Sequence, residues 1–163
     1  QIRIIDIFQE IIKLNNNTLL LLIGRGNKTD EEELRVKAKK LGILGKITFM
    51  GIRDDVPALL NAMDVFIFPS LFEGLPFTLI ETQCNGLPCI CSDSISSFSK
   101  VSDVIKFKSL AETDYEWAKE SIIWGKIGHS TKSRQQVIEA GYDIDLESVK
   151  LAKYYISLIE KSK

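Results

Sequence analysis

The sequence is short of the residue types and patterns on which several common functions depend. Its 163 residues include one histidine and three cysteines, and its formal net charge is −1. No apolar run approaches the ~20 residues needed to cross a bilayer. A chain without excess positive charge has no electrostatic attraction for nucleic acid or for an anionic membrane surface. The sequence therefore offers no transmembrane candidate and no case for a nucleic-acid partner.

The scarce cysteines and histidine also argue against metal and hydrolase chemistry. Cys84, Cys89 and Cys91 match no zinc-ligand spacing. Cys89 and Cys91 alternate with Ile90 in a segment typical of a buried strand, so we interpret them as free thiols packed as small apolar side chains. Free thiols are typical of a reducing compartment, which predicts a cytoplasmic protein. No serine–histidine–aspartate set can be assembled around His129, which lies between late helical segments.

Apolar residues change their spacing along the chain in a regular alternation. With 45% apolar and 26% charged residues, the chain has the composition of a globular protein of one domain. A continuous apolar run, typical of a strand buried on both faces, occupies residues 18–23, and further strands are predicted at residues 47–50, 65–68, 88–91 and 104–107. Helical spacing between and after them predicts an α/β fold, a Rossmann-like doubly wound parallel sheet with helices on both faces, in one domain over residues 1–163.

Helix-capping residues mark where the predicted helices begin and end. Asp30, with Glu33 three residues later, is interpreted as a capping box. Asp54 or Asp55 is expected to cap the next helix, and Gly86 to end the helix over residues 76–84. Further helices are predicted at residues 1–14, 116–124, 131–140 and 145–159. In the last of these, apolar residues recur at a spacing that predicts burial in the core: Leu146, Val149, Ala152, Tyr155, Ile156 and Ile159.

The strongest functional signal is the segment 69–81, Pro-Ser-Leu-Phe-Glu-Gly-Leu-Pro-Phe-Thr-Leu-Ile-Glu. An apolar strand runs into a turn that contains Gly74 and Pro76, and a helix opens at its far end. Unpaired amides and the positive end of the helix dipole make such a turn an anion site. Glu73 would lie at its mouth and Glu81 about two helical turns inside. Two carboxylates around an anion suit a ligand with hydroxyl-rich ends, such as a sugar nucleotide.

Two further turns are expected beside this segment, because ligands of parallel sheets bind beyond the carboxyl ends of the strands. The turns Gly24–Gly26, Gly51–Arg53 and Ser70–Phe77 meet that condition and should share one edge of the sheet. The first turn lacks the third glycine of a dinucleotide fingerprint, so it is either a plain strand-end turn or a ligand contact. Arg53 is likewise either a turn residue or a ligand contact.

An ordered set of short motifs resembles the nucleotide-binding C-terminal domain of retaining GT-B glycosyltransferases of family four, also called group 1. The set consists of Ile23-Gly24-x-Gly26, Phe49-Met50-Gly51, Ala62-Met63-Asp64-Val65, Pro69-Ser70, Glu73-Gly74-Leu75-Pro76, Glu81, Gly86-Leu87-Pro88 and Ser92-Asp93. Glu73 and Glu81 match the family's Glu-x7-Glu motif. The Glu-Gly-Leu-Pro run and the later Trp117-Ala118 are most similar to enzymes of bacterial capsular or exopolysaccharide synthesis.

The resemblance implies a role for each residue of the site. The diphosphate of the donor would be held by the segment made of Gly74, Leu75, Pro76, Phe77 and Thr78. Glu81 would accept hydrogen bonds from the ribose, and Glu73, the catalytic carboxylate, from hydroxyls of the transferred sugar. Backbone groups at Ile52 and Arg53 would contact the base. No Asp-x-Asp metal site is identified, so no metal and no cofactor are predicted, and the nucleotide-diphosphate sugar is a substrate.

The resemblance also implies parts that precede these residues. The chain starts at Gln1 inside a helical pattern and is interpreted as a fragment. The family's diphosphate-neutralising arginine and lysine, and its central first strand, would lie before Gln1, so a gap in the sheet is expected. An absent N-terminal domain would bind the glycan or lipid-linked acceptor and make any membrane contact. The full-length protein is expected in the cytoplasm, or peripherally at the inner face of the plasma membrane.

Three functional hypotheses follow. In the first, the intact protein is a glycosyltransferase that moves a sugar from a nucleotide-diphosphate donor to a polysaccharide or glycolipid acceptor with retention of configuration. In the second, this chain is a nucleotide-binding module that is inactive on its own. In the third, the protein is a sugar-nucleotide epimerase, which shares the GT-B architecture, although the Glu-x7-Glu context argues against it.

Overall fold

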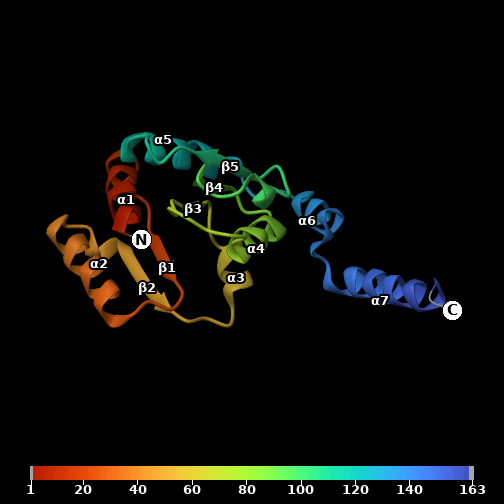
Figure 1. Cartoon of the computed structure of the whole chain (residues 1–163). Helices are drawn as coiled ribbons and strands as arrows, with labels where there is room; N and C mark the ends of the chain where they lie inside the picture. The colour runs from red at the N-terminus through yellow and green to blue at the C-terminus, as the bar shows by residue number, and fades with distance from the viewer. Residues whose placement is uncertain (1, 162–163) are drawn as a thin grey trace.

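A computed structural model, which describes residues 2–161, has the predicted α/β architecture with parallel strands (Figure 1). The strands are β1 (Leu20–Ile23), β2 (Ile47–Gly51), β3 (Phe66–Phe68), β4 (Cys89–Ser92) and β5 (Ile105–Lys108). They form two sheets, of order β1-β2 and β3-β4-β5. Neighbouring strands run parallel in both sheets, as the alternation of strands and helices predicts.

Helices cover both faces of the larger sheet. They are α1 (Ile2–Leu14), α2 (Lys28–Lys40), α3 (Val56–Asn61), α4 (Phe77–Asn85), α5 (Asp114–Gly125), α6 (Ser133–Val137) and α7 (Ile144–Lys161). Along β4, Ile90 points into a core shared with α1, α2 and α5. Its neighbours Cys89 and Cys91 point the other way and pack with Leu79 of α4. The doubly wound arrangement is therefore confirmed.

The expected gap in the sheet is present. Within residues 2–161, β1 pairs only with β2, and β3 pairs only with β4, so no hydrogen-bonded ladder joins the two sheets. The side chains of β1 and β3 are half-buried, whereas those of β4 are fully buried. The prediction that residues 18–23 form a strand buried on both faces is therefore only half right, because β1 lies at an open sheet edge.

Two predicted helix caps differ in the structure. Asn27, not Asp30, caps α2: its Oδ1 accepts a hydrogen bond from the Asp30 amide at 2.7 Å. Asp55 occupies the N-cap position of α3, but its side chain makes no capping bond because its carboxylate pairs with Arg53. The predicted end of α4 is confirmed, since Gly86 adopts a left-handed conformation there.

The last helix is where the sequence prediction is wrong. None of the α7 residues is buried, including those whose spacing predicts a place in the core. The helix extends away from the rest of the molecule and packs chiefly against the π-helical turn Ile138–Tyr142 (Figure 1). Apolar spacing shows which face of a helix is apolar, but it does not place a partner against that face.

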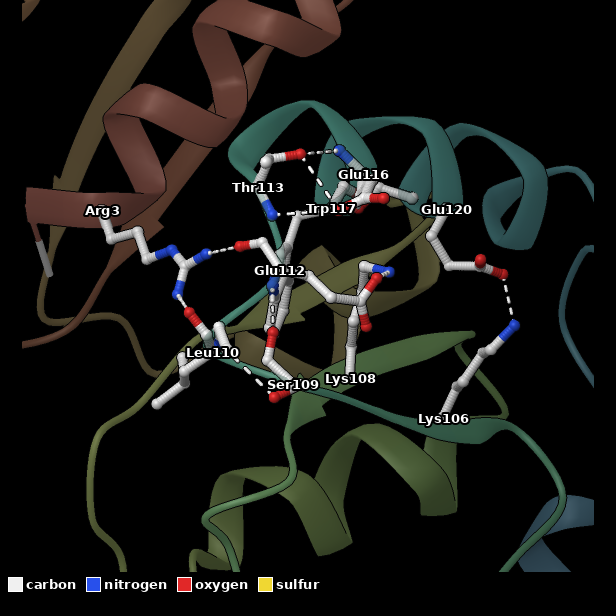
Figure 2. Close-up of polar contacts among 12 residues, drawn as sticks. Arg3, Lys106, Lys108, Ser109, Leu110, Glu112, Thr113, Glu116, Trp117 and Glu120 are labelled. Carbon is white, nitrogen blue, oxygen red and sulfur yellow. Dashed lines mark hydrogen bonds and ion pairs between the residues drawn. The ribbon is translucent and has the colours of Figure 1, made fainter.

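A single arginine fastens α1 to the segment that leads into α5 (Figure 2). The Arg3 guanidinium donates to the carbonyls of Leu110 and Glu112, both at 2.6 Å, and to the Asp114 carboxylate at 2.9 Å. It also lies 5.5 Å from the ring centroid of the buried Trp117, within the range of a cation–π contact. All three guanidinium nitrogens are therefore used to hold two segments that are far apart in the sequence.

We expect Arg3→Ala to lower the free energy of unfolding by about 2 kcal/mol, because charge-assisted hydrogen bonds to two carbonyls and a carboxylate are lost. Arg3→Lys should recover little of this loss, since an ammonium group lacks the planar fork of donors. Urea unfolding followed by circular dichroism measures the change. Arg134→Ala, on the exposed surface of α6, is the control. A loss for Arg3→Ala no larger than that of the control would contradict this account.

A close backbone approach fixes the end of α4. Gly86 has φ +79°, and a Cβ added there would lie 2.3 Å from the Ser130 carbonyl oxygen. The Ser130 amide donates to the Gly86 carbonyl at 2.9 Å, and the Ser133 hydroxyl donates to the Gln83 carbonyl at 2.5 Å. The segment before α6 therefore lies directly against the helix that carries Glu81.

Gly86→Ala and Gly128→Ala form a matched pair that isolates this approach. Gly128 also has a positive φ, of +76°, but nothing lies within 4 Å of its added Cβ. Both substitutions should cost the ~1–2 kcal/mol of a left-handed alanine, and Gly86→Ala should cost a further 1–3 kcal/mol, roughly, for overpacking. Equal destabilisation of the two variants in thermal unfolding would show that the clash is relieved without cost.

Candidate functional site

The first two of the three predicted turns are joined directly. The amide of Gly24, which follows β1, donates to the carbonyl of Gly51 at the end of β2, at 2.8 Å. Both glycines have positive φ angles, of +129° and +63°, which let each strand turn sharply. The third turn follows β3 in the other sheet, and within residues 2–161 no hydrogen bond links it to the first two.

The third turn delivers the chain to the open start of α4. Pro76 is the N-cap residue of α4, and no side chain caps the helix. Amides in the first turn of a helix have no partner within the helix, and they carry the positive end of its dipole. Of the residues predicted to hold the diphosphate, Gly74, Leu75, Phe77 and Thr78 are exposed, and Pro76 is buried. The geometry leaves this helix start accessible to an anion.

The two carboxylates of the motif have different surroundings. Glu73 is half-buried, and its Oε1 accepts a hydrogen bond from the Ser70 hydroxyl at 3.0 Å. Glu81 is exposed on α4, and the described chain places no hydrogen-bond or ion-pair partner on its carboxylate. In the described chain, one carboxylate thus has a side-chain partner and the other is exposed without one.

The predicted base-contacting residues also lie on the surface. The Ile52 side chain is 62% exposed. Arg53 pairs with Asp55 through Nε–Oδ1 and Nη2–Oδ2 distances of 2.8 and 2.7 Å. This hydrogen bonding, with the charge of the partner, raises the pKa of Arg53 and lowers the pKa of Asp55. Since the Arg53 side chain is already engaged by Asp55, the backbone of this turn is the part that is open to a ligand.

The thiols and the histidine have structural surroundings. All three cysteines are free, as predicted, and burial raises the pKa of Cys91 to about 12 and that of Cys89 well above its usual value. Neither buried thiol can therefore supply a thiolate nucleophile. The His129 ring lies 2.9 Å from the Met63 carbonyl and 3.3 Å from the Asn85 carbonyl, so it bridges two backbone segments.

One Asp-x-Asp triplet, Asp143-Ile144-Asp145, occurs in the sequence. The Asp143 Oδ1 accepts a hydrogen bond from the Leu146 amide at 3.0 Å, so this carboxylate caps α7. Within the described part of the chain, no group of three or more histidine, cysteine, aspartate or glutamate residues is arranged to hold a metal ion. The triplet therefore has a structural use at the start of a helix.

Sequence reasoning missed the polar side chains that support the site. Gln83 is fully buried in α4: its Nε2 donates to the carbonyls of Leu79 and Ser99, at 3.0 and 2.7 Å. Its Oε1 accepts from the amides of Val101 and Ser102, both at 3.0 Å. The sequence contains a signal for the burial of Gln83. This residue lies four positions after the apolar residue Leu79, and therefore on the same inner face of the helix.

Solved structures with a similar fold identify the architecture. HepE from Anabaena, in complex with UDP, superposes with a TM-score of 0.76 at 20% sequence identity, covering 96% of this chain and 45% of HepE. WaaG, a glycosyltransferase of lipopolysaccharide biosynthesis, gives a TM-score of 0.63 at 23% identity over 85% of this chain and 36% of WaaG. The fold is therefore that of one half of a GT-B glycosyltransferase.

The family follows from the sequence comparison. Residues 1–143 match the family described as "Glycosyl transferases group 1", and the chain belongs to it. It is 32% identical over 145 residues to the putative glycosyltransferase EpsF of Bacillus subtilis, which covers 87% of this chain and 37% of EpsF. It is also 32% identical over 77 residues (47% of this chain, 20% of the relative) to an Escherichia coli galactosyltransferase that acts on GlcNAc-diphosphoundecaprenol.

The chain spans less than half the length of these relatives. Across residues 2–161, no helix is both long enough and apolar enough to cross a membrane.

Proposed function

We propose that this chain is the donor-binding domain of a retaining glycosyltransferase, which transfers a sugar from a nucleotide-diphosphate sugar to a polysaccharide or glycolipid acceptor. The observation that carries the proposal is the uncapped start of α4, with Glu73 held at its mouth and Glu81 exposed on its surface. UDP and UDP-glucose are the ligands in the HepE structures, which supports a nucleotide-sugar donor for this chain as well.

The start of α4 would bind and stabilise the diphosphate. The amides of Gly74, Leu75, Phe77 and Thr78 would donate hydrogen bonds, and the helix dipole favours negative charge at this end. Because diphosphate is the leaving group, the same groups would also stabilise the charge that develops on it during transfer. With retention by a front-face route, as the family resemblance implies, no protein nucleophile is required.

The two carboxylates would each bind a different sugar of the donor. An ionised carboxylate only accepts hydrogen bonds, so it matches the hydroxyl donors of a vicinal diol. Glu81, exposed on α4, would accept hydrogen bonds from the ribose. Glu73, fixed by Ser70, would accept them from hydroxyls of the transferred sugar. Ile52 and Arg53, in the turn after β2, would contact the base through their backbone.

We extend the proposal to the acceptor and the cellular setting of the whole enzyme. A glycan or lipid-linked acceptor would bind to a second domain, on the far side of the donor. Several relatives are named as lipopolysaccharide or Vi polysaccharide enzymes, which supports a role in bacterial surface polysaccharide synthesis, including capsule. Such an enzyme would work in the cytoplasm or at the inner face of the membrane. The 163-residue chain would bind donor without transferring it.

Titration of the chain with UDP, GDP and ADP, followed by amide NMR, tests the donor site. At least one nucleotide should shift the amides of the 74–78 segment. Glu81→Ala should weaken its binding by ~1–3 kcal/mol, because hydrogen bonds to the ribose are lost. Glu73→Ala should leave nucleoside-diphosphate binding unchanged and remove the added affinity of the sugar nucleotide. Glu33→Ala, an exposed glutamate on α2, is the control.

Two results would contradict the donor site. The diphosphate assignment fails if none of the three nucleotides shifts the 74–78 amides. The division of roles fails if Glu73→Ala weakens UDP binding as strongly as Glu81→Ala does.

We further propose that donor binding requires no metal ion, because amides and a helix dipole supply the positive potential. UDP affinity should then be the same, within about twofold, in EDTA and in millimolar manganese, as expected when no charge-assisted metal contact contributes. Isothermal titration measures both conditions. Affinity that collapses in EDTA and returns with manganese would show that a metal bridges the diphosphate.

A further inference from the structure

A hollow lies outside the residues assigned to the donor, and Ser94 in its lining contacts the turn that carries Glu73. It has a volume of about 430 Å³ and lies between the loop that follows β4 and the strand β5. Its lining residues are Asp93, Ser94, Ile95, Ser96, Ser97 and Phe107. Asp93 directly follows β4, so the hollow opens at the carboxyl end of the strand, where parallel sheets bind their ligands.

Hydroxyl groups connect this hollow to Glu73. The Ser92 hydroxyl, fully buried at the end of β4, lies 2.6 Å from the Ser94 hydroxyl. Ser94 donates in turn to the carbonyl of Ser70 at 3.0 Å, and the Ser70 hydroxyl donates to Glu73 at 3.0 Å. Ser94, one of the residues that line the hollow, therefore contacts the turn that carries Glu73.

The lining combines free polar groups with an apolar floor. Asp93 is exposed, and in the described chain only its backbone amide is engaged, by the Lys108 carbonyl at 3.0 Å. Ser96 accepts a hydrogen bond from the Phe98 amide at 3.4 Å, which leaves its hydroxyl proton free to donate. The floor consists of the buried Ile95 and the half-buried Phe107.

These groups select one class of ligand. A second phosphate would meet the Asp93 carboxylate and is disfavoured by like charge. A wholly apolar ligand would strip water from Asp93 without replacing its hydrogen bonds. A sugar ring offers hydroxyl donors for Asp93 and the serines, and an apolar C–H face for the floor. Phe98, in the same loop and 85% exposed, adds an aromatic surface beside the hollow.

We propose that this hollow is a subsite for a hexopyranose ring, with Asp93 as its principal hydrogen-bond acceptor. The inference deepens the proposed function and rests on it, because it places a sugar beside Glu73. The ring belongs either to the donor's transferred sugar or to the terminal sugar of the acceptor. Both sources share the chemistry of the subsite, and they differ in whether the ring arrives attached to the diphosphate.

Three probes separate the two sources in amide NMR of the whole chain: UDP, UDP-glucose and methyl α-D-glucopyranoside, with the galactose epimers of the last two run in parallel. A donor-sugar subsite is shown by UDP-glucose or UDP-galactose shifting the amides of residues 93–97 while UDP does not. An acceptor-sugar subsite is shown by a methyl glycoside shifting the same amides in the presence of UDP.

Asp93→Asn is the diagnostic variant, because it keeps the size of the side chain and removes its charge. It should weaken binding of the responsive sugar probe about three- to tenfold, as the loss of charged hydrogen bonds predicts, and leave UDP affinity unchanged. Asp64→Asn is the matched control, since Asp64 is also exposed but precedes β3, at the opposite end of the strands. It should change neither affinity.

The subsite is overturned if UDP shifts the 74–78 amides while no sugar probe, at tens of millimolar, shifts residues 93–97. It is also overturned if Asp93→Asn and Asp64→Asn bind the sugar probes equally. Failure of the donor site is a different result: UDP then shifts nothing, while the methyl glycosides still report on the hollow independently. The two proposals can therefore fail separately.

Discussion

The packing of α1 against α5 is the contact on which the whole molecule depends. No strand pairing joins β1-β2 to β3-β4-β5 in the described chain, so side chains must hold the two sheets together. One continuous core runs from β2 and α2 through α1 to α5 and β4. Arg3 adds directed hydrogen bonds to this nonpolar contact and fixes the position of α1 along the α5 segment. The contact between α1 and α5 therefore sets where the three strand-end turns lie relative to one another.

Much of the fold could be predicted because its signals are local. Strands β1 and β3 are continuous apolar runs, and the left-handed end of α4 requires a residue without a Cβ, which Gly86 supplies. The errors arise where two local signals compete or where a partner is needed. Asn27 and Asp30 are both good caps, and the turn geometry decides between them. Apolar spacing in α7 predicts a covered face, yet no described segment covers it.

The site shows the same division between local and distant information. Glu73 and Glu81 stand in a contiguous motif, so their positions at the mouth and on the body of α4 follow from the sequence. The hydrogen bonds that hold this segment in place do not follow from the sequence. Ser94, which anchors the carbonyl of Ser70, is 24 residues away along the chain, and no periodicity links the two. Hydrogen bonds between loops depend on how the strands are ordered, which only the folded chain reveals.

Gln83 couples the position of α4 to the position of the loop between β4 and β5. Its amide group bonds to α4 on one side and to the loop between β4 and β5 on the other, with no polar atom of that group left unused. Breaking any of these hydrogen bonds in the water-free interior costs free energy, so α4 and the loop move together as one rigid unit. A ligand that pulls on the start of α4 would carry the residues after β4 with it. The spacing between α4 and residues 99–102 of the loop is thereby set by Gln83 and not by the ligand.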